Sequence, residues 1–583
     1  ISACLVGSEM CIRDRTANTG TTLPALAGAD VLANAGTDPE RTINSELTVR
    51  TLTTQADVKI NDGALLRISE GSLTQRGANH WIQTSAGAMG RITSGRADGE
   101  FHLNLPEPLD TASRNDITMR VSVVDNPVTA GAAAGSFVPN LLVKNGTGSA
   151  TNFGGSGFAA PTTNTFNSFT AGTIINAGRV VPQFGSAFGS GAITIRDGGQ
   201  LATYSLTAAN GAHFSNALSL AGAGALENAG SLGAIRMANA VTFSGNTVLT
   251  AETRLHPHGG SDVGTMAGVV RGLGGIDKTG DGFTALTAAN TYTGATTITR
   301  GTVVTSRLAD GGVASGIGAS SGAASNLVFN GGVLRYDGPG ASTNRGFTVD
   351  LGGGGITSNY HTGGMTLTPS AIAMTAGGDR GFTLNAVHRT ANVFNGVLED
   401  PSAGRTSLTF GGIGTWQITK NQNFTGAVTV TNAATNFQGG ALLVGDGGTT
   451  GDIGKGVQLT LLNASDIVFN RSNSLEIAHA ITGAANSEIV QMGSGTLTLS
   501  GTGDNATGNL RVENGTVVLA KTSSFNVHAA AGSVFLNNGT IRLGGTGDDQ
   551  ILNSSAMFVR NGTFDLNGKY EIVGRVEAVS YTH

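Results

Sequence analysis

The chain is short of the residues on which several large protein classes depend. Its only two cysteines, Cys4 and Cys11, lie within the first fifteen of 583 residues, so no disulfide framework can hold the remainder. Charged residues make up 13%, about half the usual quarter. The sequence has no apolar run of about 18 residues, which excludes a membrane-spanning helix. With a net charge of −5 and no basic tract, it also lacks the electrostatic signature of nucleic-acid binding.

Both ends of the sequence read as foreign to the rest. Residues 1–15 contain the run Cys-Leu-Val-Gly-Ser-Glu-Met-Cys-Ile-Arg-Asp-Arg, which resembles translated sequencing-adapter DNA, and residues 579–583 resemble the same kind of artefact. The alternative for residues 1–15 is a genuine disordered terminus. We expect residues 16–578 to be a metagenomic fragment cut at both ends. The lack of a signal peptide or an anchor is then uninformative.

Glycine is what the chain has in excess. It contains 90 glycines, roughly twice the usual share of about 7%. Hydrophobic residues reach 39%, so the chain is not simply disordered. Abundant Gly, Thr, Asn and Val with few Lys and Glu favour strands joined by tight turns. No sustained stretch shows apolar residues at helical spacing, and the composition therefore predicts an all-β fold.

One phrase recurs along the sequence. Each copy begins at a Gly-x-Gly step, continues through an aromatic-Thr-Gly or similar step, and closes on a Gly that opens another strand. The clearest copy runs from Lys278-Thr-Gly-Asp-Gly282 through Asn290-Thr-Tyr-Thr-Gly294 to Gly301. Internal self-similarity of this kind predicts a solenoid. The four copies lie near residues 141–184, 273–306, 408–445 and 489–520.

A shorter unit near the C-terminal end indicates the coil period. Asn-Gly-Thr followed by an alternating strand recurs with Gly515, Gly539 and Gly562 at its corners, 24 and then 23 residues apart. Asn-Gly suits a tight corner because both residues tolerate positive φ. Strands joined in this way favour stacking on their equivalents one coil later, in parallel. The sequence thus predicts a single-stranded parallel β-helix of about 24 coils, with right-handed winding as the default.

Alternation within these strands predicts which side chains face the core. Charged residues at alternate positions are expected to face water, and the apolar residues between them are expected to face inward. The outward set is Arg511, Glu513, Arg542 and Asp565, and the inward set is Leu510, Val512, Val517, Leu519, Ile541, Leu543, Phe564 and Leu566.

The regularity of the pattern changes along the chain. Residues 16–130 are expected to form irregular coils, with recognisable strands at 47–50 and 64–68. Residues 131–578 are expected to form the regular β-helix that carries the four repeats. A solenoid of this kind usually works as a rod or a surface.

The recurring phrase resembles the autotransporter-associated β-strand repeat. Gly493-Ser-Gly-Thr-Leu-Thr-Leu-Ser-Gly501 carries the first half of the typical repeat, and Asn290-Thr-Tyr-Thr-Gly294 carries the second. The copies cover about a quarter of the chain. The resemblance implies an adhesin-like passenger of a secreted or cell-surface bacterial protein, whose repeats assist outer-membrane export and folding. Its implied partners are the export machinery and a host-surface, matrix or glycan ligand.

Two short motifs could hold a metal ion. Gly544–Leu552 matches one calcium-binding repeat-in-toxin nonapeptide, but such sites need neighbouring copies, and a Gly/Asp-rich corner is the favoured interpretation. His256 and His258, with Asp262 nearby, offer two imidazoles and a carboxylate. Pro257 and the glycines that follow indicate an exposed loop instead. We therefore predict no metal, catalytic or cofactor site.

A glycan-active β-helix enzyme, either a polysaccharide lyase or a hydrolase, is the alternative function. Such enzymes need acidic residues gathered on one face and aromatic platforms for sugars. Acidic residues are sparse here, with Asp548-Asp549 as the best pair, and Trp81 and Trp416 are the only tryptophans. We expect a role without catalysis, in which exposed Thr/Asn ladders and the loops 305–325 and 432–440 bind any ligand.

Overall fold

The computed structural model divides the chain into two compact units, residues 1–296 and 297–583. Regular structure in its described part is almost entirely β-strand, with one short 3-10 helix, η2 (Ala324–Asn326). The described residues are 4–6, 9–11, 30–33, 40–76, 80–84, 90–106, 116–127, 136–153, 167–204, 206, 212–359, 363–431, 440–456, 458–522 and 526–578.

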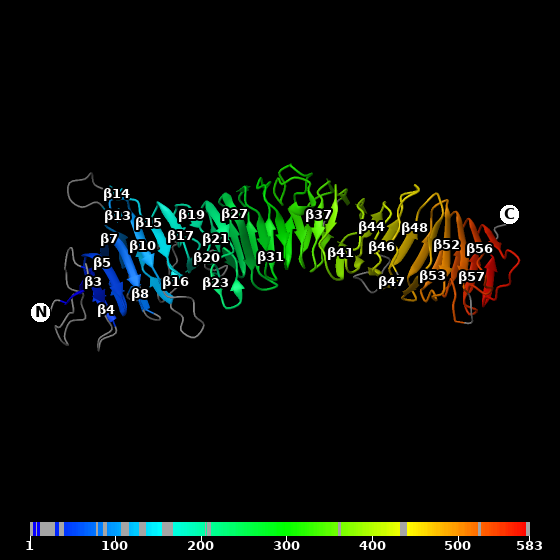
Figure 1. Ribbon diagram of the computed structural model, residues 1–583, viewed down its shortest axis with the longest axis horizontal. Helices are drawn as coiled ribbons and strands as arrows, with labels where there is room; N and C mark the ends of the chain where they lie inside the picture. The colour runs from blue at the N-terminus through cyan, green and yellow to red at the C-terminus, as the bar shows by residue number, and fades with distance from the viewer. Residues whose placement is uncertain are drawn as a thin grey trace. The chain divides into compact units, whose positions relative to one another are not determined.

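In the first unit, parallel strands stack in three columns that the chain visits in turn. Figure 1 shows strands of successive coils side by side along this unit. The first column contains β3 (Asp30–Ala33), β5 (Leu47–Thr54), β7 (Leu65–Gln75), β10 (Glu100–Asn104), β15 (Leu141–Asn145), β17 (Gly172–Ile175), β19 (Ile193–Ile195), β22 (Leu218–Gly222), β27 (Thr247–Pro257) and β29 (Val270–Gly272). The second contains β4 (Glu40–Ile43), β6 (Asp57–Ile60), β8 (His80–Thr84), β11 (Asp116–Arg120), β16 (Ser149–Phe153), β18 (Gly178–Pro182), β20 (Gly199–Ala202), β25 (Ile235–Met237), the end of β27 and β30 (Ile276–Lys278).

The third column of this unit has two parts. The start of β5 pairs with the start of β7, β7 pairs with β9 (Arg91–Ser94), and β9 pairs with β12 (Ser122–Val123). Further along the chain come β21 (His213–Phe214), β26 (Ala240–Phe243), β28 (Val263–Met266) and β31 (Phe283–Leu286). The antiparallel pairs among the described residues are short hairpins: β1 (Cys4–Val6) with β2 (Glu9–Cys11), β13 (Asn126–Pro127) with β14 (Phe137–Val138), and β23 (Leu226–Glu227) with β24 (Gly230–Ser231). Strand β32 (Thr296–Ile298) spans the boundary between the units.

The second unit repeats the three-column plan. One column contains β33 (Thr302–Thr305), β35 (Val333–Tyr336), β38 (Gly354–Ser358), β41 (Arg380–Ala386), β43 (Thr406–Gly412), β45 (Val428–Thr431), β47 (Gln458–Leu462) and β50 (Ala480–Gly483). Another contains β36 (Ala341–Thr343), β39 (Met365–Leu367), β42 (Ala391–Phe394), β44 (Thr415–Ile418), β46 (Ala441–Val444), β48 (Asp466–Phe469), β51 (Glu488–Gln491), β53 (Asn509–Val512), β55 (Val534–Leu536), β57 (Ala556–Val559) and β59 (Arg575–Ala578). The third contains β34 (Leu327–Phe329), β37 (Phe347–Val349) and β40 (Ile372–Met374), and later β49 (Leu475–Ile477), β52 (Thr496–Gly501), β54 (Thr516–Lys521), β56 (Thr540–Leu543) and β58 (Thr563–Asp565).

The pairing register confirms the predicted coil. Thr516, Thr540 and Thr563 are direct partners on β54, β56 and β58, so each Asn-Gly-Thr unit lies on the one before it. Such parallel stacking of successive equivalents is a parallel β-helix, as predicted. The hand of the winding, the number of coils and the chain divisions at residues 15, 130 and 578 stay predictions, and residues 579–583 lie outside the described residues.

The corners explain why glycine is so abundant. Gly515 and Gly539 have φ values of +67° and +89°, which only glycine adopts at little cost. A Cβ at Gly515 would also lie 2.3 Å from the carbonyl oxygen of Gly493 in the preceding coil. Close contact between stacked corners therefore requires glycine at this position.

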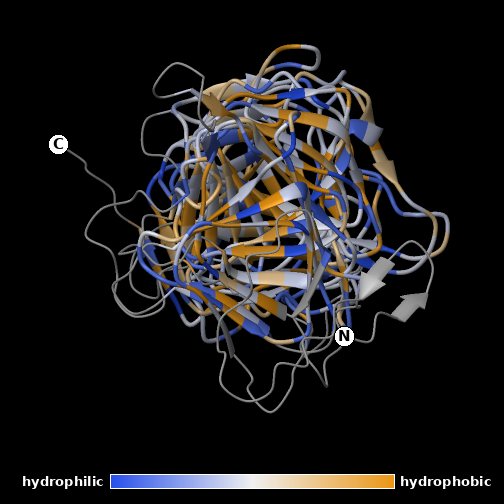
Figure 2. Ribbon diagram, turned by 90° about the vertical axis from the view of Figure 1, so that its left-hand side faces the viewer, coloured by the Kyte–Doolittle hydropathy of each residue, from blue (hydrophilic) through white to orange (hydrophobic). Residues whose placement is uncertain are grey.

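Alternation of burial along the strands produces the core, and hydropathy alternates along individual strands accordingly (Figure 2). Six of the predicted inward residues are buried: Leu510, Val512, Val517, Leu519, Ile541 and Leu543. The prediction is wrong for Leu566, which is 43% exposed, and Phe564 is only half-buried. Both residues lie at or just after β58, the last described strand of its column, where no described strand covers them.

Candidate functional site

The Gly-x-Gly step of the repeat forms a corner around a buried lysine. Lys278, at the end of β30, is fully buried, and its Nζ donates to the carbonyl oxygens of Gly280 at 2.7 Å and Gly282 at 2.6 Å. Gly280 has a φ of +72°, and the corner turns these carbonyls inward. The lysine satisfies acceptors that the strand ladder leaves unpaired.

The same position holds a buried donor in two further copies of the repeat. Lys144 donates to Asn145, Gly146 and Ala177 carbonyl oxygens at 3.1, 2.8 and 2.9 Å. Gln491 donates through Nε2 to the carbonyl oxygens of Gly493 and Gly495, at 2.7 and 3.2 Å. This role was not predicted from the sequence. Its signal is a long polar side chain two residues before the Gly-x-Gly step.

A buried amide precedes the aromatic-Thr-Gly or similar step in all four copies. In the clearest copy, Asn290 Oδ1 accepts from the backbone N–H of Val270 at 2.8 Å, and Tyr292, two residues later, is fully buried. The equivalent amide oxygens accept from a backbone N–H of the preceding coil as well: Asn167 from Val123, Gln422 from Leu398 and Asn505 from Ile481. The repeat is thus a device that joins neighbouring coils through buried hydrogen bonds.

Removing the corner donor should destabilise the repeat. We expect Lys278→Met to lower local stability by roughly 2–4 kcal/mol, because two buried carbonyl groups lose their donor. The measurement is hydrogen exchange of the peptides that contain β30 and β31. Lys455→Met, at an exposed lysine, is the matched control and should leave exchange unchanged. Equal protection in both variants would contradict a bonding role for Lys278.

His256 and Pro257 lie on a strand, so the predicted exposed loop is wrong for them. They end β27 and pair with Arg236 and Met237 of β25. Proline fits there because a strand end tolerates a residue without an N–H. Burial lowers the pKa of His256 to about 4, and its Nδ1 lies 2.9 Å from Thr279 Oγ1.

Asp262 is held by backbone groups. Its Oδ1 accepts from Asn239 N at 2.7 Å, and its Oδ2 accepts from Gly259 N at 2.6 Å. The His256 and His258 rings are 5.8 Å apart between centroids. Among the described residues, no group of three or more His, Cys, Asp or Glu side chains is placed to hold a metal ion.

The nonapeptide Gly544–Leu552 forms a hydrogen-bonded corner. Gln550 is fully buried and exchanges two hydrogen bonds with the backbone of Lys521, at 2.8 and 3.0 Å. Glu571 from the following coil accepts from the backbone N–H groups of Gln550 and Ile551, at 2.8 and 3.2 Å. The polar atoms of both side chains are used in closing the corner.

The stability of this corner should depend on pH. Burial, with the nearby Asp549 carboxylate, raises the pKa of Glu571 from 4.5 to about 7. Between these values the folded chain holds a proton that the unfolded chain has lost, so stability should fall as pH rises from 4.5 to 7. Glu571→Gln should flatten this slope, measured by hydrogen exchange of residues 544–552. The exposed Glu577→Gln variant should keep it, and an unchanged slope in Glu571→Gln would contradict the assignment.

A buried arginine makes many of the hydrogen bonds that hold the loop 305–325. Arg345, just after β36, is buried, and its guanidinium donates to carbonyl oxygens of Ala309, Val313, Gly318 and Ser320 at 2.9–3.1 Å. Residues 315–318 are buried, whereas 312–314 are exposed. The loop therefore has a defined conformation at the surface of the second unit. Of the other predicted binding loop, 432–440, only Gly440 is among the described residues.

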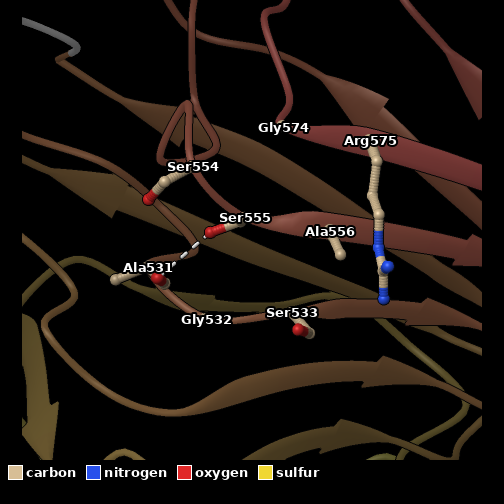
Figure 3. A pocket seen from close by; sticks show the side chains of 8 residues that line it. All are labelled: Ala531, Gly532, Ser533, Ser554, Ser555, Ala556, Gly574 and Arg575. Carbon is tan, nitrogen blue, oxygen red and sulfur yellow. Dashed lines mark hydrogen bonds between the residues drawn. The ribbon is translucent and has the colours of Figure 1, made fainter.

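A pocket of about 480 Å³ lies on the outer face of the second unit (Figure 3). Small side chains at the starts of β55, β57 and β59 line it together with Arg575, and Ser555 Oγ donates to Ala531 O at 3.1 Å. Next to it, Phe535 and Phe558 stack with centroids 4.9 Å apart. The guanidinium groups of Arg511 and Arg575 lie over the two rings, at 4.9 and 5.4 Å from the centroids. These ring faces are occupied and cannot stack on a sugar.

The two tryptophans do not form a sugar platform either. Trp416, on β44 as expected for a strand position, is buried in the core. Trp81, on β8, has the guanidinium of Arg120 4.5 Å above its ring centroid.

Within the described ranges, no helix has the length and apolar character needed to span a bilayer.

The segments that form these corners also match a known family of repeats. The passenger-associated-transport-repeat family matches residues 276–304 and 489–519, which contain the corner donors Lys278 and Gln491. The chain carries passenger-associated-transport-repeats. The predicted resemblance to the autotransporter repeat is thereby confirmed.

A curated relative points the same way. The chain is 35% identical over 253 residues, 43% of its length, to a protein of Brucella suis biovar 1 (strain 1330) named "Adhesin BmaC autotransporter". The aligned part is 7% of that relative's length, so the chain spans only a small part of it. No solved structure matches the chain.

Proposed function

We propose that the chain is an adhesive passenger segment of a secreted or cell-surface bacterial protein. The observation that carries the proposal is the 35% identity to an autotransporter adhesin over 253 residues, combined with two passenger-associated-transport-repeats. The parallel β-helix supports it, because stacked coils present a long outer surface on which binding features can be placed. The relationship also supports the outer-membrane export machinery as a partner.

The repeats fit a role in folding after export. Lys278 bonds two carbonyls within four residues of itself, so one corner can form from local chain alone. Asn290 then joins this coil to the preceding one. Local bonds of this kind lower the entropy cost of adding the next coil, and a repeat would thus act as a starting point for coil formation outside the cell.

Adhesion can be tested directly with the chain itself. Beads coated with the folded chain should be retained on host epithelial monolayers at least several-fold more than beads carrying an equal amount of heat-unfolded chain. Equal retention would reject an adhesive role. Release of oligosaccharides from plant or bacterial polysaccharides would instead favour the glycan-active enzyme, although similarity to an adhesin supports a role without catalysis.

A further inference from the structure

Three corners of the second unit share the tripeptide Asn-Gly-Thr, in which a self-modification reaction is chemically possible. The backbone nitrogen of the glycine can attack the side-chain carbonyl carbon of the asparagine. The asparagines are Asn514, Asn538 and Asn561, and all three are exposed. Because the tripeptides are identical, any difference in their reactivity has to come from the fold.

At the first of these corners, the asparagine holds its carbonyl group against its own glycine. The backbone N–H of Gly515 donates to Asn514 Oδ1 at 2.8 Å. The carbon that this nitrogen would attack is bonded to that oxygen at about 1.2 Å, so nitrogen and carbon lie about 3–4 Å apart. Reacting atoms held about 3–3.5 Å apart are in a near-attack arrangement. The folded corner thus keeps this pair close to the geometry of the reaction.

The other described Asn-Gly pairs direct their side chains to neighbouring coils. Asn561 Nδ2 donates to Asn538 Oδ1 at 3.2 Å, so these two amides are engaged with each other. The remaining side-chain oxygens each accept a hydrogen bond from another coil: Asn145 from Asn176, Asn330 from Gly352, Asn395 from Thr419 and Asn567 from Arg542. Each of these amides has to leave its partner before its carbonyl carbon can meet the following glycine.

We propose that Asn514 is a site of spontaneous deamidation, selected by the fold over Asn538 and Asn561. A bond forms between Gly515 N and Asn514 Cγ, and the bond between Cγ and Nδ2 breaks. Nδ2 leaves as ammonia, with the proton from Gly515 N. Water, which reaches this exposed corner, then opens the resulting succinimide ring at either carbonyl group and leaves aspartate or isoaspartate. The reaction consumes only water, and neither an oxidant nor a cofactor takes part.

Isoaspartate at this position should disturb the stacked corner. The side-chain carbon of Asn514 then lies in the main chain, which becomes one atom longer between β53 and β54. Gly515 has no free space around it, because a Cβ built on it would lie 2.3 and 2.5 Å from the carbonyl oxygens of Gly493 and Gly495. The Thr516 N–H also donates to Gly495 O at 3.0 Å. The modification should therefore loosen the start of β54.

The three corners can be compared within one molecule. The full folded chain is incubated in mildly alkaline buffer, and its proteolytic peptides are analysed by mass spectrometry that separates isoaspartate from aspartate. We expect the peptide with Asn514 to deamidate at least about fivefold faster than the peptides with Asn538 and Asn561. In denaturant, where the corners are lost, the three identical tripeptides should react at similar rates.

Two results would overturn the proposal. One is a rate at Asn514 in the folded chain that is no higher than the rate at Asn538 or Asn561. The other is a preference for Asn514 that persists unchanged in denaturant, because the wider sequence rather than the fold would then select the site.

A variant tests why the fold selects Asn514. Asn561→Ala removes the donor to Asn538 Oδ1 and leaves the Asn514 corner intact, so Asn538 should deamidate several-fold faster while Asn514 keeps its rate. Asn486→Ala, at another exposed asparagine of the second unit, is the matched control and should leave both rates unchanged. An unchanged rate at Asn538 in Asn561→Ala would reject selection by the stacked side chains.

Discussion

Leu543→Asp should unfold the coil around β56, at a cost of about 4 kcal/mol or more. Leu543 is fully buried and stacks directly on Leu519 of β54. The substitution removes an apolar side chain and places a carboxylate in a core column without a partner. Because each coil of a solenoid contacts mainly its neighbours, the loss should appear first as faster hydrogen exchange in β54, β56 and β58.

The adjacent residue provides the control. Arg542 points outward, with half of its side chain exposed, and lies 3.4 Å from Asp565. Arg542→Asp replaces this surface pair with two like charges and should cost less than about 1 kcal/mol. Equal loss of protection in the two variants would contradict the assigned facing of β56 and, with it, the coil register.

Alternation and corner chemistry made much of this fold predictable. Asn-Gly units mark positions of positive φ, and charged residues such as Arg542 mark the outward face of each strand. The side chains at the alternate positions between these charged residues are then assigned to the core. The alternation assigned Leu566 to the core, but Leu566 is exposed. No described strand packs over this residue, so the burial expected of an inward position is missing.

The alternation of residues did not predict which polar side chains are buried. A lysine or arginine is assigned to the surface by its charge, whereas Lys278, Arg380 and Arg471 are buried and donate to backbone carbonyls of loops and corners. Which carbonyls point inward depends on the path of the loop. That path is fixed by contacts between residues tens of positions apart, which no local pattern records.

The ion pairs of Glu227, on the β23–β24 hairpin, illustrate the same limit. The hairpin segment 226–231 reads as ordinary coil sequence, because it has neither a strong turn dipeptide nor alternating strands of useful length. Its partners Arg179 and Arg236 belong to separate coils. Only the stacking of coils brings these three charges together, so an ion-pair cluster of this kind can be recognised only once the register is known.

Arg345→Met should release the loop 305–325 from the second unit. The native guanidinium donates to four loop carbonyls and to Ser320 Oγ, and methionine of similar length supplies none of these bonds. Ala309 O, Gly318 O and Ser320 O keep second donors in Thr343 Oγ1, Ser315 Oγ and Gly312 N, so the loss of the guanidinium bonds should cost roughly 1–3 kcal/mol of local stability. The loop peptides should lose most of their exchange protection and become sensitive to proteases, whereas β33 and β35 should keep theirs, since their ladder does not involve Arg345.

Arg389→Met is the matched control, because Arg389 is an exposed arginine of the same unit, and it should leave the loop protected. Loop protection that survives Arg345→Met would show that apolar burial, above all of Ile317, suffices to hold the segment. Loss of protection throughout β33 and β35 would show instead that loop and coil unfold together. Residues 309–311 and Gly322 have further bonds to the coil, made by Thr343, Asn344, Gly346 and Ser370. Release is therefore expected to be greatest at residues 312–320, which Arg345 contacts through Val313, Gly318 and Ser320.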